Sequence, residues 1–102
     1  MDLFEVIAEP NRRAILSALL DGNRSVGELV DELPLSQPTV SKHLKVLRTG
    51  GFVAAEPVAQ RRMYRLQPEQ FAEFARWLEP YRATWAGRLD ALESHLDDME
   101  DT

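Results

Sequence analysis

Hydroxyl, amide and basic side chains follow one another between residues 36 and 48 of this 102-residue chain, in a mixture that suits nucleic acid. Hydroxyl and amide groups hydrogen-bond to the edges of bases, whereas lysine and arginine neutralise phosphates. A second basic pair follows at Arg61 and Arg62. We therefore expect the residues that contact DNA to be Ser36, Gln37, Thr39, Ser41, Lys42, His43, Lys45, Arg61 and Arg62.

Some basic and polar side chains have a structural interpretation as well. Ser36 is a helix cap that can also hold a phosphate. His43 flanks an apolar stripe, so a packed histidine is as well supported as a DNA contact. Arg65 either reaches DNA or pairs with an acid of the scaffold. Arg12 and Arg13 begin a helix, where we expect one to form an ion pair and the other to reach the DNA backbone.

The charge of the chain is distributed unevenly. The net charge is −5, yet residues 36–66 carry six basic residues and one acid, a net charge of +5. The remainder sums to −10, and six acids follow Leu89 with no lysine or arginine among them. Such an asymmetry indicates that the basic third of the chain meets an anionic partner.

The residue types needed for catalysis or metal binding are scarce. Cysteine is absent, which excludes disulfides and thiolate metal sites. The two histidines lie far apart, and the sequence has neither a Gly-rich phosphate loop nor a nucleophile elbow. His95 beside Asp97 and Asp98 is a weak metal candidate in an acidic tail. We predict a protein that is not an enzyme and that needs no cofactor or metal.

Three helices are expected before residue 34. The first is short and ends at Pro10, and the second runs from about Pro10 to Leu20. Ser25-x-x-Glu28 is a capping box, in which each side chain satisfies a backbone N–H of the other residue. It begins the third helix, which ends at Pro34.

A fourth helix and a hairpin follow, and they carry the basic residues. The helix is expected from about Gln37 to Thr49, with Ser36 as its cap and with a buried stripe of Val40, Leu44 and Leu47. Residues 52–55 and 62–66 predict two strands around a turn near residues 58–60, where Pro57 suits an edge position. Two helices followed by a basic hairpin predict a winged helix-turn-helix, which places its second helix in the major groove.

The last helical segment is expected from Pro68 to about Met99 and carries an apolar seam at coiled-coil-like spacing. Pro80 should kink or split it near Glu79. The seam is more apolar surface than one short helix layer can hide, so it predicts a homodimer. The expected interface residues of this segment are Phe74, Leu78, Tyr81, Trp85, Leu89 and Leu92.

The residues of the helix pair and the hairpin are familiar. The stretch LSQPTVSKHLKVLR at 35–48, GFV at 51–53 and YRL at 64–66 resembles the ArsR family of bacterial repressors, as does EPNRRAIL at 9–16. The resemblance implies a homodimeric winged-helix repressor that binds an inverted-repeat operator. It also implies that the first helix joins the last in the dimer interface, which adds Leu3 and Phe4 to the expected set.

The chain departs from the metal-sensing members of that family. Those members carry Cys-x-Cys on the third helix, where this chain has ELVDEL at 28–33, or metal-binding pairs on the last helix that are absent here. The segment that contains Trp77 and Trp85 looks like the subgroup with no recognised metal site. The family's wing usually has Gly near its tip, whereas Ala59 and Gln60 stand here, so the turn type stays open.

We predict a mainly α, winged helix-turn-helix fold with a two-stranded β wing and terminal dimerisation helices. Residues 1–102 are expected to form one domain, with the core and wing at 10–66 and dimerisation helices at 1–9 and 68–100. With no secretory signal and no apolar run near the roughly 20 residues of a membrane span, a cytoplasmic protein is expected. The predicted function is sequence-specific repression through double-stranded DNA. The alternatives are a protein-interaction module and a repressor released by a small organic molecule near Trp77 and Trp85.

Overall fold

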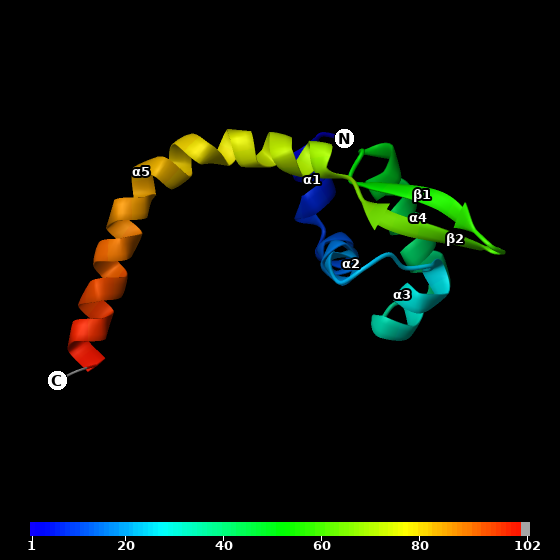
Figure 1. Ribbon diagram of the computed structural model, residues 1–102, viewed down its shortest axis with the longest axis horizontal. Helices are drawn as coiled ribbons and strands as arrows, with labels where there is room; N and C mark the ends of the chain where they lie inside the picture. Colours follow the sequence, from blue (N-terminus) through cyan, green and yellow to red (C-terminus); the bar gives the residue numbers. More distant parts are fainter. Residues whose placement is uncertain (101–102) are drawn as a thin grey trace. The chain divides into compact units, whose positions relative to one another are not determined.

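The computed structural model describes residues 1–100, which form five helices and one two-stranded sheet (Figure 1). The predicted winged helix-turn-helix class is confirmed. The residues fall into two compact units, one from Met1 to Ala72 and the other beginning at Glu73. In chain order the elements are α1 (Leu3–Ala8), α2 (Pro10–Leu20), α3 (Val26–Glu32), α4 (Gln37–Thr49), β1 (Val53–Val58), β2 (Arg61–Leu66) and α5 (Pro68–Glu100).

Local caps set where the helices of the first unit begin. The carboxylate of Glu9 accepts a hydrogen bond from the backbone N–H of Arg12 (3.0 Å) at the start of α2. The predicted capping box of α3 is present, since Ser25 Oγ accepts from the N–H of Glu28 (3.2 Å) and Glu28 Oε1 accepts from the N–H of Ser25 (3.0 Å). Ser36 Oγ accepts from the N–H of Thr39 (3.3 Å) and caps α4.

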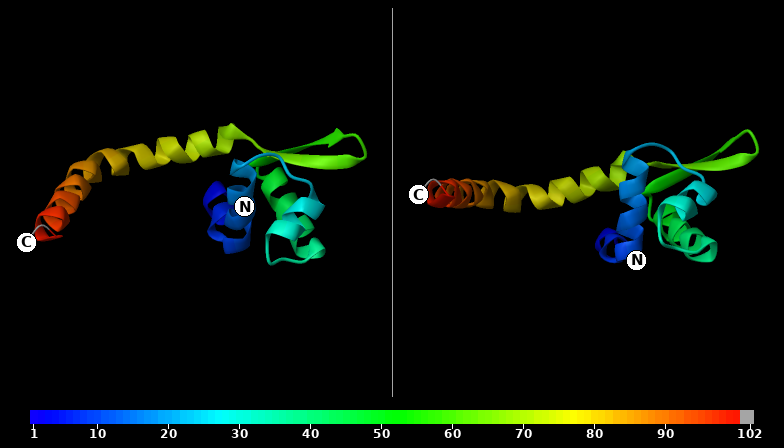
Figure 2. Two further views of the ribbon diagram at one scale, coloured as in Figure 1. Left: turned by 60° about the horizontal axis from the view of Figure 1, so that its bottom comes forward. Right: turned by 90° about the horizontal axis from the view of Figure 1, so that it is seen from below.

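The hairpin β1–β2 is longer than the sequence predicted. The strands pair antiparallel from Val53 opposite Leu66 to Val58 opposite Arg61, so the turn contains Ala59 and Gln60 alone. Ala59 has a φ of 57°, in the left-handed region that costs a residue with a Cβ roughly 1–2 kcal/mol. The hairpin projects beyond the helices of its unit in all views (Figure 2).

One further strand contact comes from the loop between α2 and α3. The backbone N–H of Arg24 donates to the carbonyl of Tyr64 (3.1 Å), and the N–H of Tyr64 donates to the carbonyl of Arg24 (2.8 Å). This bridge attaches the base of the wing to the helices, and no local sequence pattern predicts it.

The core of the first unit gathers one apolar face from each of its helices and the base of the hairpin. Phe52 is fully buried at the start of the wing and meets the ring of Phe71 edge-on, with centroids 5.2 Å apart. This contact packs the first turn of α5 against the base of the hairpin. The buried apolar residues are Val6, Ile15, Leu16, Leu19, Leu29, Val40, Leu44, Leu47, Phe52, Val53 and Tyr64.

α5 is one helix of 33 residues that continues through Pro80. Of the two expected outcomes at Pro80, a split helix is therefore wrong. Proline has no N–H to donate to the carbonyl four residues earlier, and the ribbon bends in its yellow-to-orange stretch (Figure 1). The carbonyl that loses its donor is that of Arg76, whereas Thr84 Oγ1 donates to the carbonyl of Pro80 itself (2.7 Å).

Candidate nucleic-acid interface

α4 has a buried face and an exposed polar face. Its buried residues are Val40, His43, Leu44 and Leu47. Thr39 and Ser41 are half-buried at the edge of the exposed face. Of the predicted contacts on and before this helix, the exposed ones are Ser36, Gln37, Lys42 and Lys45.

The polar side chains at the start of α4 hold one another in place. Ser36 Oγ donates to Thr39 Oγ1 (2.9 Å), and Gln37 Nε2 donates to Ser41 Oγ (3.1 Å). Four of the predicted DNA contacts therefore lie in two bonded pairs on the first turns of the helix. Such bonds restrict rotamers before a ligand arrives and so lower the entropy lost on binding.

His43 belongs to the core and not to the exposed face. Its residue is 8% exposed, its Nε2 lies 3.6 Å from Glu9 Oε2, and its Nδ1 is buried with no hydrogen-bond partner among the described residues. A side chain so enclosed cannot reach DNA. The prediction that His43 contacts DNA is corrected accordingly, and the packed histidine fits the structure.

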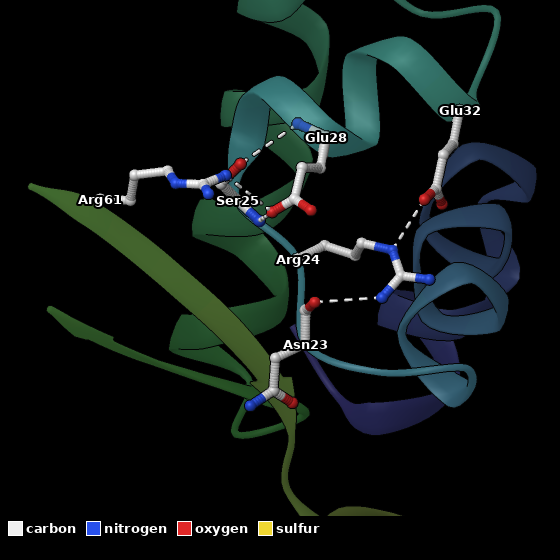
Figure 3. Close-up of polar contacts among 6 residues, drawn as sticks. All are labelled: Asn23, Arg24, Ser25, Glu28, Glu32 and Arg61. Atoms are coloured by element: carbon white, nitrogen blue, oxygen red, sulfur yellow. Dashed lines mark hydrogen bonds and ion pairs between the residues drawn. The ribbon is translucent and has the colours of Figure 1, made fainter. Parts of the chain in front are cut away.

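Arg61 is engaged within the protein (Figure 3). Its Nη1 lies 3.3 Å from Glu28 Oε1, which joins the wing to the capping box of α3. The pKa of Glu28 is lowered mainly by the hydrogen bonds from the backbone and side chain of Ser25, and then by the charges of Arg61 and Arg24. At the end of α3, Glu32 Oε1 lies 2.7 Å from Nε of Arg24, which precedes the helix.

Other arginines of the first unit are also satisfied internally. Arg12 donates to the carbonyls of Val6 (2.6 Å) and Glu5 (3.1 Å). Arg13 donates to the carbonyls of Ile7 (2.8 Å) and Ala8 (2.7 Å), so both arginines cap the end of α1. Neither arginine forms an ion pair with a described residue, so the expected ion pair is wrong; a contact of Arg13 with the DNA backbone stays a prediction.

Arg65 lies on β2 beside acceptors of the scaffold. Its Nη1 donates to Gln67 Oε1 (3.4 Å), and its Nε lies 4.0 Å from Glu56 Oε1 on β1. The structure therefore shows the alternative in which Arg65 pairs with an acid of the scaffold, Glu56.

Four basic side chains of the Met1–Ala72 unit have no ion pair or hydrogen bond to any residue that the structure describes. We call them the unpaired cations: Lys42, Lys45, Arg48 and Arg62. All are exposed, three lie on α4 and the fourth lies on β2. The uncompensated positive charge of this unit is thereby confined to the helix and the hairpin.

A groove of about 520 Å³ lies between α4 and β2. Its lining residues are Ser41, Leu44, Lys45, Arg48, Thr49, Arg62 and Tyr64. Arg48 was absent from the predicted contacts. A signal for it existed, because a residue three positions after Lys45 lies on the same face of a helix.

α5 exposes large apolar side chains along its length. Trp85 is 48% exposed, Leu89 62% and Leu92 54%. Trp77 and Tyr81 have ring centroids 4.9 Å apart, and the guanidinium of Arg88 lies 4.5 Å from the ring centre of Trp85. Of the other predicted interface residues, Phe4, Leu78 and Tyr81 are exposed, whereas Leu3 and Phe74 are half-buried.

Within residues 1–100, no three side chains among His, Cys, Asp and Glu are grouped so that they could hold a metal ion. None of the helices described here is both long enough and apolar enough to cross a membrane.

Residues 9–55 match the model of the ArsR family of bacterial regulatory proteins. The HTH-type transcriptional regulator Rv2034 of Mycobacterium tuberculosis is 37% identical over 98 residues, which are 96% of this chain and 89% of that protein. The chain belongs to the ArsR family. The HTH-type transcriptional repressor SmtB of M. tuberculosis is 41% identical over 71 residues, 70% of this chain and about half (53%) of the repressor. An ArsR-like transcriptional regulator from Rhodococcus sp. RHA1 superposes with a TM-score of 0.72 at 30% identity, over 90% of this chain and 87% of its own.

Membership of the ArsR family makes the chain a DNA-binding transcriptional regulator and not an enzyme, as the sequence predicted. The matched segment contains α2, α3, α4 and the start of β1. It therefore includes Lys42, Lys45 and Arg48, whereas Arg62 and all of α5 lie outside it.

Proposed function

We propose that the chain is a homodimeric, metal-independent transcriptional repressor that binds an inverted-repeat operator. The observation that carries this proposal is the position of the unpaired cations, all on α4 and β2. Charges left uncompensated in the protein are available to neutralise phosphates and release counterions. The SmtB relative is named a repressor, which supports the same direction of regulation.

α4 is the proposed reading helix, and residues 10–66 are the proposed DNA-binding core. Gln37, Thr39, Ser41 and Lys42 supply the base contacts, because they lie at the start of the helix, where helix-turn-helix proteins meet base edges. Ser36 caps the helix and adds a phosphate contact. Lys45 and Arg62 bind phosphates, while the contribution of Arg61 is reduced by Glu28.

α5 and α1 are the proposed dimerisation helices. Leu78, Tyr81, Trp85, Leu89 and Leu92 are each at least 37% exposed, an apolar surface that a second copy of the same helix would cover. Leu3, Phe4 and Phe74 are the remaining proposed interface residues. Two copies related by a twofold axis would present two α4 helices, which matches an inverted repeat.

The proposal contains no metal or cofactor, and it places the protein in the cytoplasm, where a transcriptional regulator meets chromosomal DNA. A small organic inducer at the aromatic part of α5 stays a hypothesis that tryptophan fluorescence across a metabolite panel would test.

Selection of bound duplexes from random-sequence DNA by the full chain tests the proposed function. We expect an inverted repeat to be enriched and to bind at least a hundredfold more tightly than a scrambled duplex of the same composition. Equal affinity for both duplexes across a salt series would contradict sequence-specific repression.

A further inference from the structure

The groove between α4 and β2 has the chemistry of an anion site. Its rim carries three of the unpaired cations, Lys45 and Arg48 from α4 and Arg62 from β2. Its floor includes Leu44 and Tyr64, which are 1% and 8% exposed. The described residues that line the groove include no carboxylate, so no internal acid competes for the cations.

The donors of this groove suit an oxyanion of the phosphate type. Guanidinium groups bind phosphate oxygens in pairs through their planar fork, and charge-assisted hydrogen bonds are about twice as strong as neutral ones. Ser41 and Thr49 add hydroxyl groups to the lining.

We propose that this groove holds one phosphodiester of the DNA backbone, bound jointly by Arg48 of α4 and Arg62 of β2. The inference rests on the proposed function and adds to it a shared phosphate and a new residue, Arg48. With α4 in the major groove and the hairpin at the neighbouring minor groove, the DNA backbone between the two grooves would pass between these two elements. One phosphate held from both sides fixes the register of α4 along the duplex, so Arg48 is a positioning residue for base reading.

The test uses the full chain and the inverted-repeat duplex obtained by selection. Each backbone phosphate of one half-site is replaced in turn by an uncharged methylphosphonate, and the affinity is measured for the wild type and for the R48Q and R62Q variants. We expect one position at which methylphosphonate weakens wild-type binding by about tenfold, the size of one charged hydrogen bond. At that same position R48Q and R62Q should each lose less than the wild type, because one of the two partners of the phosphate is already gone, and the R48Q/R62Q double variant should lose no more than about twofold.

Two matched variants serve as controls. Arg76→Gln removes an exposed cation of α5 and should leave the tenfold effect in place. Lys42→Gln weakens binding from outside the groove, and it too should keep the effect at that position. Thermal unfolding of every variant should match the wild type, since all of the changed side chains are exposed.

Two results would overturn this inference. If R48Q and R62Q reduce the methylphosphonate effect at different phosphate positions, or at none, the groove does not hold a shared phosphate. Micromolar binding of inorganic pyrophosphate, with unchanged duplex affinity in R48Q, would assign the groove to a small phosphorylated ligand. Failure of the selection to enrich any duplex is a separate result, because it contradicts the proposed function itself.

Discussion

The Met1–Ala72 unit and the helical segment from Glu73 onward leave different chemistry at the surface. The first buries its apolar side chains in a core and leaves four cations, on α4 and β2, without internal partners. The second exposes apolar side chains such as Leu89 and Leu92 along one helix. Positive charge without an internal partner favours binding to a polyanion, whereas exposed apolar surface favours packing against another apolar surface. The comparison supports the proposal of two partners, DNA for the first unit and a second copy of the chain for α5.

The two units also differ in what their acidic residues do. In the first unit two acids of α3 form ion pairs with basic side chains, Glu28 with Arg61 and Glu32 with Arg24. The six acids that follow Leu89 all belong to the sequence of the second unit, and these repel a polyanion. The surface proposed for dimerisation is thereby discouraged from binding DNA on its own.

The largest effect is expected from a charge placed in the apolar seam. Trp85→Asp should give a monomer, because a carboxylate would be buried in the dimer interface. The affinity for an inverted repeat should fall by about 10²–10⁴-fold as the second half-site contact is lost. Sedimentation and duplex binding measure the two effects. Ala83→Asp introduces the same charge at an exposed position off the seam and should change neither the oligomeric state nor the duplex affinity. A dimeric Trp85→Asp protein would contradict the proposed α5 dimer interface.

Removal of a reading side chain should have the next largest effect. Alanine at Lys42 or Gln37 should weaken binding to the selected duplex by about 1–3 kcal/mol. Discrimination against a mutated half-site should fall as well, since the lost contact is to a base. Titrations with the intact and the mutated half-site check this, and undiminished discrimination would remove these residues from the reading set.

The two wing arginines should differ from each other. Arg62→Ala should weaken selected and scrambled duplexes alike and lower the slope of log affinity against log salt by up to about one unit. Arg61→Ala should lower it less, because Glu28 already neutralises this side chain in the free protein. If the Arg61 variant changes the salt slope more, the internal ion pair does not restrain Arg61.

A gain in affinity is expected from Glu28→Gln. Glutamine keeps the capping box of α3 but releases Arg61 to bind phosphate. Since exposed ion pairs are worth about 0.2–1 kcal/mol, all duplexes should bind roughly one and a half to fivefold more tightly. Glu32→Gln is the matched control, since it removes the same charge from α3 without releasing a wing residue. Weaker binding by Glu28→Gln than by the control would show that the pair serves to orient the wing.

No effect is expected from metal. A chelator or stoichiometric zinc should leave the duplex affinity unchanged within error, because the sequence has no cysteine and no three-ligand set lies within the described residues. A tenfold change in affinity with zinc would contradict metal independence.

The helices of the first unit could be predicted because their signals are local. The capping box of Ser25 and Glu28 and the cap at Ser36 act within four residues, so spacing alone located the starts of α3 and α4. The turn of the wing was harder, since Ala59 adopts a left-handed conformation for which sequence rules expect glycine. The bridge from Arg24 to Tyr64 joins residues too far apart in the chain for a local pattern to indicate.

The candidate nucleic-acid interface likewise contains some features that a local pattern predicts and others that tertiary packing decides. Exposure of Lys42 and Lys45 follows from helical periodicity, and so does that of Arg48, which was overlooked. The partner of Arg61 is 33 residues away, so tertiary packing decides whether that cation is available. His43 was ambiguous because it borders the buried stripe, and packing against Glu9 places it in the core.

Sedimentation of the chain with the selected inverted-repeat duplex shows how many chains bind one operator. We expect two chains on each duplex, with dissociation to unbound protein when the inverted repeat is replaced by its scrambled counterpart at physiological salt. One chain on each duplex, or the same binding to the scrambled sequence, would contradict a homodimeric, sequence-specific repressor.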